Sequence, residues 1–223
     1  LQAVTFHPYY PIPEEATDAI LRLKELVRGY NPSAILLQGE SGCPSQLEYN
    51  HALCYHKWTE YSQVKWILRR MICDFSLDVP SSIFTMVDLQ YDFMLQSFGL
   101  VRMNLLKEPV YKRPSFYAVS HMVALLDSKM KPFSGIEVTE SSGKEIKSVG
   151  VSKDGKCIAV AYWRGDDKPS DTLDKEKVNA LVSGVIFENP VLLDPITGRV
   201  YDLSYVMLRG GQQRGINATK FTG

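Results

Sequence analysis

Five polar or aromatic residues stand directly after apolar runs of the chain, where their side chains could do chemistry. His7 and Tyr9 follow the first run, Glu40 and Ser41 follow the second, and Asp88 follows the third. If these runs are parallel strands of an α/β barrel, their carboxyl ends share one face, which is where such folds hold their active sites. We therefore expect these five residues to meet at a common site.

Glu40 is the main catalytic candidate among them. It lies between two glycines in Gly39-Glu40-Ser41-Gly42, where neither helix capping nor helix pairing calls for a carboxylate. A carboxylate in a cleft is costly without a partner. His7 and Tyr9 alternate on the preceding strand end, so both can point toward Glu40, and a tyrosine hydroxyl there could hold the carboxylate ionised. The pattern alone also fits a solvent-exposed loop glutamate.

Other chemistries on the same loop match the sequence less well. The segment from Gly39 to Cys43 approaches the G-x-S-x-G nucleophile elbow of α/β-hydrolases, but Cys43 stands where that motif needs a glycine. Cys43 could pair with His51 or His56 as a thiol and its base, yet no local signature supports the pair. The two histidines are five residues apart, which misses the four-residue step of a helical metal pair. The sequence therefore predicts no metal site and no cofactor.

The composition is that of a globular protein with a buried core. Of the 223 residues, 45% are hydrophobic and 22% are charged, which excludes a disordered chain. Lysine plus arginine number 25, as do aspartate plus glutamate, so we expect no nucleic-acid partner. The aliphatic run Met122–Leu126 falls far short of the roughly 20 residues that span a bilayer. The four cysteines form neither a zinc motif nor a dense disulfide framework, and they leave the compartment undecided.

The rhythm of the sequence changes near Lys131–Gly135, where proline and glycine end a long helical pattern. Residues 1–131 alternate short apolar runs with amphipathic helical patterns, which predicts an α/β domain with parallel strands covered by helices. Residues 132–223 show short strands between turns, which predicts an antiparallel β-sandwich domain with a hairpin turn at Asp154-Gly155. The predicted strands are Ala3–Phe6, Ala34–Leu37 and Ile83–Val87 in the first part, and Ile136–Thr139, Cys157–Trp163, Val182–Phe187 and Val191–Leu193 in the second.

Three segments of the first part resemble a known family. They are His7-Pro8-Tyr9, the run from Leu36 to Gly42, and the run from Lys112 to Ala118 ahead of an apolar helix. Their order is similar to the last three βα units of a (β/α)8-barrel glycoside hydrolase, of the clan of retaining enzymes that includes cellulases and β-xylosidases. Similar members of this clan also carry a small β-sandwich after the barrel. The resemblance implies a carbohydrate substrate, and it slightly favours an extracellular or periplasmic compartment.

The resemblance also implies roles for particular residues. Glu40 matches the catalytic nucleophile at the end of the seventh strand. His7 and Tyr9 match the sixth-strand end, where the family orients the nucleophile and touches the sugar. Asp88 matches the eighth-strand end, where many members present a tryptophan as a sugar platform that this sequence lacks. Trp58, in the loop after Glu40, could stack on a sugar instead, and Ser41 beside Glu40 is a further substrate-binding candidate.

The expected barrel is incomplete. A whole barrel has eight strands and about 250 residues, whereas three strands are expected here. A retaining glycosidase needs a second carboxylate about 5 Å from the nucleophile, and the family places it on the fourth strand. We therefore expect the chain to be the carboxyl-terminal portion of a longer enzyme, inactive alone, whose partner is the amino-terminal half of the same barrel. The alternatives are an inactive carbohydrate-binding or scaffold protein with this fold, or an ordinary α/β domain joined to a β module.

Overall fold

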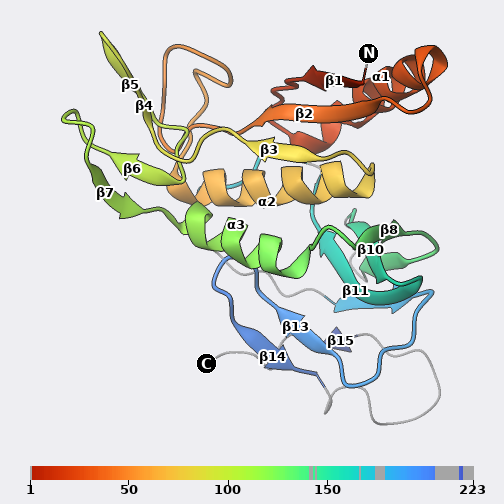
Figure 1. Ribbon diagram of the computed structural model, residues 1–223. Helices are drawn as coiled ribbons and strands as arrows, with labels where there is room; N and C mark the ends of the chain where they lie inside the picture. The colour runs from red at the N-terminus through yellow and green to blue at the C-terminus, as the bar shows by residue number, and fades with distance from the viewer. Residues whose placement is uncertain are drawn as a thin grey trace.

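A computed structural model describes residues 2–140, 143, 145–165, 167–173, 179–203 and 216–217. Figure 1 shows three layers: a parallel sheet with one helix beside it, a middle layer of two helices, and a group of small antiparallel sheets. The two middle helices are α2 (Glu60–Ser76) and α3 (Pro114–Leu125). A mixed α/β first part followed by an antiparallel second part is the arrangement that the sequence predicts.

The parallel sheet places its strands in the order β1-β2-β3, with β2 in the middle. Helix α1 packs Ile20 and Val27 against Leu36 of β2, and these apolar side chains form the first core cluster. Helix α2 begins with a capping box in which Thr59 and Ser62 exchange hydrogen bonds, so the first turn of the helix is stabilised. The elements are β1 (Ala3–Phe6), the 3-10 helix η1 (Pro13–Ala16), α1 (Thr17–Tyr30), β2 (Ile35–Ser41) and β3 (Ser81–Ile83).

The region between β3 and α3 differs from the sequence expectation. The predicted strand Ile83–Val87 is wrong in its bounds, because β3 ends at Ile83 and Val87 forms an isolated bridge with Val101. Two short hairpins then precede α3, and the sequence did not predict either of them. Their strands are β4 (Leu89–Tyr91) with β5 (Met94–Gln96), and β6 (Val101–Met103) with β7 (Pro109–Lys112).

The second part consists of small antiparallel sheets. The turn predicted at Asp154-Gly155 joins β10 to β11, and both turn residues have the positive φ that such a hairpin requires. The predicted strand Val182–Phe187 is shifted, since the observed strand ends at Ser183. A closed sandwich and a barrel both remain predictions. The strands are β8 (Lys131–Phe133), β9 (Glu137–Glu140), β10 (Lys147–Lys153), β11 (Lys156–Trp163), β12 (Asn179–Ser183), β13 (Val191–Leu193), β14 (Val200–Asp202) and β15 (Ile216–Asn217).

The two parts are joined around Glu14 of η1. Its Oε1 accepts hydrogen bonds from Arg69 Nε of α2, at 2.8 Å, and from Trp163 Nε1 of β11, at 2.6 Å. Arg69 Nη1 also donates to the carbonyl oxygen of Asp167 at 2.6 Å. A shared apolar cluster that includes Met122 of α3 and Val149 of β10 adds packing across the same boundary. The parts that the sequence predicts before and after residue 131 are thus held together by hydrogen bonds and apolar packing.

Candidate active site

Glu40 lies at the carboxyl end of β2, beside the residues that follow β1. The Tyr9 hydroxyl donates a hydrogen bond to Glu40 Oε2 at 2.9 Å, and His7 Nδ1 lies 3.5 Å from the same oxygen. The side chains of Glu40 and His7 are 36% and 42% exposed, respectively. Three of the five residues expected at the strand ends therefore meet. Both of these contacts use Oε2 of Glu40, and among the described residues no hydrogen bond is made to Oε1.

The end of β2 is shaped so that Glu40 reaches this position. Gln38 donates from its side-chain amide to the carbonyl oxygen of Glu40, which holds the strand end in place. Gly39 lies against β1, where a Cβ atom would come within 2.2 Å of Thr5 Oγ1 and 2.7 Å of His7 Nε2. Glycine at position 39 is therefore what allows the His7 ring to cross toward Glu40. The sequence shows a glycine next to Glu40, but this steric reason depends on the neighbouring strand.

Tyr9 is held in its protonated form by its surroundings. Burial raises the pKa of its phenol, and the hydrogen bond to Glu40 and the charge of that carboxylate raise the same pKa further. The ring also packs edge-on against Phe98, with the centroids 6.3 Å apart. A phenol that keeps its proton donates to Glu40 across the whole physiological range. The contact between Tyr9 and Glu40 is the one that alternation along the strand predicts, and the catalytic role of Glu40 stays a prediction.

Asp88 does not join this site. Arg113 Nη1 and Nη2 donate to its two carboxylate oxygens at 2.7 and 2.9 Å, and the amides of Gly99 and Met103 donate to them at 2.9 and 3.1 Å. Both Asp88 and Arg113 are buried. All these donors occupy the carboxylate, so Asp88 lies in a structural contact apart from Glu40, and its substrate-binding role stays a prediction. Asp88 fixes the turn between β3 and the hairpins.

Trp58 and Ser41 also lie in the interior. Trp58 is 3% exposed, donates from Nε1 to the carbonyl oxygen of Leu53 at 2.8 Å, and carries the Lys168 ammonium over its ring at 4.7 Å. Its faces are thus not available for a sugar. Ser41 is fully buried, and its Oγ has no hydrogen-bond partner among the described residues. Both side chains are buried in this structure, and the substrate-binding roles that the resemblance implies for them stay predictions.

The sequence reasoning missed a group of aromatic residues on the loop after β2 and on the β4–β5 hairpin. The rings of His51 and Tyr91 stack with their centroids 5.1 Å apart, and Tyr49 meets Tyr55 edge-on at 6.0 Å. Tyr55 and Phe93 are 72% and 79% exposed. We call these five residues the aromatic rim. Figure 1 shows the loop and the hairpin rising together at the end of the sheet where β2 finishes. The clustering of tyrosines in the loop was the available signal.

The aromatic rim is connected to the neighbourhood of Glu40. The hairpin runs back to Ser97, whose carbonyl oxygen accepts a hydrogen bond from Ser45 N at 2.9 Å, and to Phe98, which packs on Tyr9. Three of the loop residues, His51, Leu53 and Tyr55, have positive φ. Such conformations are costly for residues other than glycine and tend to occur at functional sites. The rim is therefore a candidate extension of the site.

Cys43, which follows β2, is fully buried. Burial raises the pKa of the Cys43 thiol, so it does not supply a thiolate, and all four cysteines are free. No group of three or more potential metal ligands occurs among the residues that the structure describes. In that part of the chain no helix has the length and apolar character needed to cross a bilayer.

Comparisons with known proteins give partial structural likenesses. No protein family matches the sequence, and no curated protein does. An FMN-binding β-glucuronidase from Facaelibacterium prausnitzii L2-6 matches 80% of this chain at 16% identity, with a TM-score of 0.41. A Bacteroides fragilis protein named as a β-galactosidase matches 91% at 14% identity, with a TM-score of 0.40. The chain covers 30% and 32% of those two chains, less than a third of each. Because both TM-scores lie below 0.5, the likeness does not establish a shared activity.

Proposed function

We propose that this chain is the carboxyl-terminal part of a retaining glycoside hydrolase in which Glu40 is the nucleophile. The observation that carries the proposal is the half-exposed carboxylate at the end of the middle parallel strand, held at one oxygen by Tyr9. Catalytic groups of parallel α/β folds lie at this end of the strands. The other oxygen, Oε1, makes no hydrogen bond among the described residues and is the attacking atom in this proposal.

The reaction would proceed by two displacements. Glu40 Oε1 forms an ester bond to the anomeric carbon while the glycosidic C–O bond breaks, and the leaving oxygen takes a proton from a general acid. Water then attacks the same carbon, the ester bond breaks, and the proton of the water returns to the acid/base group. The Tyr9 hydroxyl stays on Oε2 throughout and fixes the direction in which Oε1 attacks. His7, beside the same oxygen, is placed to touch the sugar.

The second carboxylate would come from outside this chain. A retaining pair stands about 5 Å apart, and within the described residues the side chains that contact the Glu40 carboxylate are those of Tyr9 and His7. The amino-terminal half of the same barrel is the partner that would supply the general acid. A plant or microbial poly- or oligosaccharide is the substrate class, with the aromatic rim available for its outer sugars.

The test is covalent labelling of Glu40 in the natural protein that carries this chain, after its intact mass has been measured. The reagents are dinitrophenyl glycosides with fluorine at carbon 2, tried in both anomeric configurations. Fluorine slows both displacements, and dinitrophenolate departs without being protonated, so the ester accumulates whether or not a general acid is present. We expect one added sugar per chain, located on the peptide that contains Glu40, in a protein heavier than this chain.

Two variants serve as controls for the labelling. Glu40→Gln removes the nucleophile and should abolish the added mass, whereas Glu25→Gln changes an exposed carboxylate of α1 and should leave it in place. A label on another residue, or an equal label in Glu40→Gln, would refute the assignment of the nucleophile.

One observation favours a second candidate, a carbohydrate-binding or scaffold protein that lacks catalysis. In the described residues the surroundings of Glu40 consist of a phenol and an imidazole, without a partner carboxylate. Such a protein would bind oligosaccharides, measured by calorimetry, and acquire no covalent label. Binding without labelling thus supports the scaffold, and labelling at Glu40 supports the hydrolase.

A further inference from the structure

The aromatic rim is carried by two segments that are fastened to each other, the loop 44–55 and the β4–β5 hairpin. The side-chain amide of Asn50 donates to Met94 Sδ at 3.7 Å, and the His51 ring stacks on Tyr91. Figure 1 shows the loop and the hairpin projecting together. The rim is therefore one surface that both segments build.

Glu48 holds the base of this surface. It is buried, and its Oε1 accepts hydrogen bonds from the amide and the hydroxyl of Ser97, both at 2.5 Å. Its carbonyl oxygen accepts from the amide of Tyr55 at 2.8 Å, which closes the loop that carries Tyr49 and His51. Hydrogen bonds to a carboxylate are stronger than those between neutral groups. One buried residue thus ties the loop to itself and to the end of the hairpin.

The rings on this fixed base are exposed. Tyr49, Tyr55, Tyr91 and Phe93 are between 40% and 79% exposed. Exposed apolar groups that gather in one place mark binding surfaces. Aromatic side chains have few rotatable bonds, so they lose little conformational entropy when a ligand covers them. The rim therefore has the character of a preformed recognition surface.

The charge of the two segments selects the class of ligand. Residues 44–55 and 89–97 contain no lysine or arginine. Of their two carboxylates, Glu48 is buried, and Asp92 at the turn of the hairpin is exposed. An anionic ligand would find no permanent cation on these segments, and it would meet the charge of Asp92. A neutral sugar has C–H groups on its faces and hydroxyls at its edge, which match aromatic faces and phenol hydroxyls.

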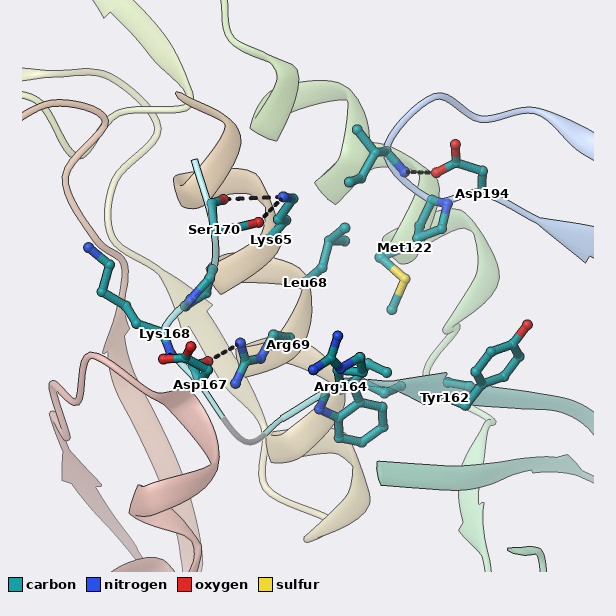
Figure 2. Close-up of a pocket in the computed structure, with 16 residues that line it drawn as sticks. Lys65, Leu68, Arg69, Met122, Tyr162, Arg164, Asp167, Lys168, Ser170 and Asp194 are labelled. Atoms are coloured by element: carbon teal, nitrogen blue, oxygen red, sulfur yellow. Dashed lines mark hydrogen bonds between the residues drawn. The ribbon is translucent and has the colours of Figure 1, made fainter. Parts of the chain in front are cut away.

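A cavity at the junction of the two parts is separate from the rim. Its volume is about 680 Å³, and Leu68, Met122 and Tyr162 are among the side chains that line it (Figure 2). In Figure 1 helix α2 stands between β11 and the parallel sheet. None of the five rim residues, all of which the structure describes, lines this cavity. The rim, which joins the surroundings of Glu40 through Phe98, is the surface that continues from the candidate active site.

We propose that the aromatic rim is a subsite for the outer units of a neutral glycan, and that Glu48 is the residue that positions it. The faces of Tyr55 and Phe93 stack on the sugars, and the phenol hydroxyls bind at their edges. This inference rests on the function proposed for Glu40, which supplies the class of substrate. It deepens that function in two respects, because it makes the substrate uncharged and longer than the sugar held at Glu40.

The test is calorimetry on the natural protein that carries this chain, with Glu40→Gln so that no ligand is consumed. The neutral probes are the disaccharides and hexasaccharides of β-linked glucose, xylose, mannose and galactose, and the acidic probe is hexagalacturonate. We expect one neutral hexasaccharide to bind about three- to tenfold more tightly than its disaccharide, and at least about tenfold more tightly than hexagalacturonate. No gain with chain length, or equal binding of hexagalacturonate, would overturn the proposal.

Substitutions of exposed rings locate the subsite. Phe93→Ala and Tyr55→Ala should each weaken hexasaccharide binding about three- to fivefold and leave disaccharide binding unchanged, because only the longer ligand reaches the rim. Tyr30→Ala removes a similarly exposed ring at the end of α1 and is the matched control, which should change neither affinity. Undiminished hexasaccharide binding in both rim variants would place the ligand elsewhere and refute the subsite.

Two substitutions test the positioning role of Glu48. Glu48→Ala removes the acceptor of both Ser97 bonds and releases the loop, so hexasaccharide affinity should fall at least as far as in Phe93→Ala. Glu48→Gln keeps an oxygen for Ser97, and Oε2 of Glu48 makes no hydrogen bond among the described residues, so this variant should recover most of the affinity. Circular dichroism checks that each variant is folded. Parental affinity in Glu48→Ala, or an equal loss in Glu48→Gln, would refute the positioning role.

Labelling of Glu40 separates this inference from the proposed function. The fluorinated glycosides carry one sugar, so Glu48→Ala and Phe93→Ala should be labelled at the parental rate. Binding that depends on chain length without any label would refute the nucleophile and support the rim. Labelling at Glu40 without such binding would refute the rim and support the nucleophile.

Discussion

Glu40 and Asp88 are both carboxylates that follow strands of the first part, yet their surroundings differ in kind. Asp88 is buried and receives two hydrogen bonds from Arg113 and two from backbone amides. Glu40 is half exposed and receives one hydrogen bond, from the neutral phenol of Tyr9. A position at a strand end is therefore not enough to make a carboxylate a reactant. What matters is whether an oxygen remains unengaged and accessible.

The type of donor matters as much as the number. A guanidinium neutralises a carboxylate and locks it in place, which suits a buried turn. A phenol orients the carboxylate and leaves its charge available for attack on an electrophilic carbon. The two regions can be tested against each other through substitutions that remove one donor at a time.

The largest effect is expected at Arg113. Arg113→Met leaves the Asp88 carboxylate buried without its cation, which should lower the free energy of unfolding by about 3–5 kcal/mol. Urea denaturation followed by circular dichroism measures this change. The matched substitution Glu40→Gln should change the same quantity by less than about 1 kcal/mol, because an exposed group loses one hydrogen bond. Equal losses of unfolding free energy in the two variants would mean that Asp88 and Glu40 do not differ in this way.

A smaller effect is expected from Tyr9→Phe. Loss of the hydroxyl removes the hydrogen bond to Glu40, worth about 1 kcal/mol, and lets the carboxylate rotate. We expect the rate of covalent labelling at Glu40 to fall about tenfold, with the labelled position unchanged. The rate is followed by mass spectrometry over time. An unchanged rate would show that Tyr9 does not orient the nucleophile.

The pH dependence of stability tests the same contact. In the folded chain the pKa of Tyr9 is raised, whereas in the unfolded chain the phenol loses its proton near pH 10. The contribution of Tyr9 to the free energy of unfolding is therefore present below about pH 10. It is lost as the pH rises from there toward the raised pKa of the folded chain. Urea denaturation measures the free energy of unfolding. Between about pH 9 and about pH 11 this free energy should fall less steeply with pH in Tyr9→Phe than in the parent chain. Parallel declines would mean that the phenol is not perturbed.

The smallest effect concerns the aromatic rim. Tyr91→Ala removes the ring that stacks on His51, and we expect the affinity for a long oligosaccharide to fall about three- to fivefold, as loss of one stacking contact of under about 1 kcal/mol implies. Labelling of Glu40 should be unaffected. Trp58→Phe is the control, since that ring is buried, and it should leave glycan affinity unchanged. Calorimetry with oligosaccharides of increasing length distinguishes the two.

The contact of His7 and Tyr9 with Glu40 could be predicted because backbone geometry dictates it. Adjacent parallel strands end at the same edge, and alternation along a strand sets which side chains face each other. The fate of Asp88 could not be predicted, since its partner Arg113 is 25 residues further along the chain. The two hairpins before α3 were missed because strands of three or four residues are too short to show periodicity.

The bonds that meet at Glu14 have a consequence for how the molecule unfolds. Glu14 is contacted from α2 and from β11, so opening the interface breaks both contacts together and exposes Ile72 and Met122 to water. A chain cut at residue 131 would keep Glu14 without its hydrogen bond from Trp163. The apolar surface at Ile72 and Met122 would be exposed to water. The two parts should accordingly unfold in one cooperative transition, and the first part alone should aggregate.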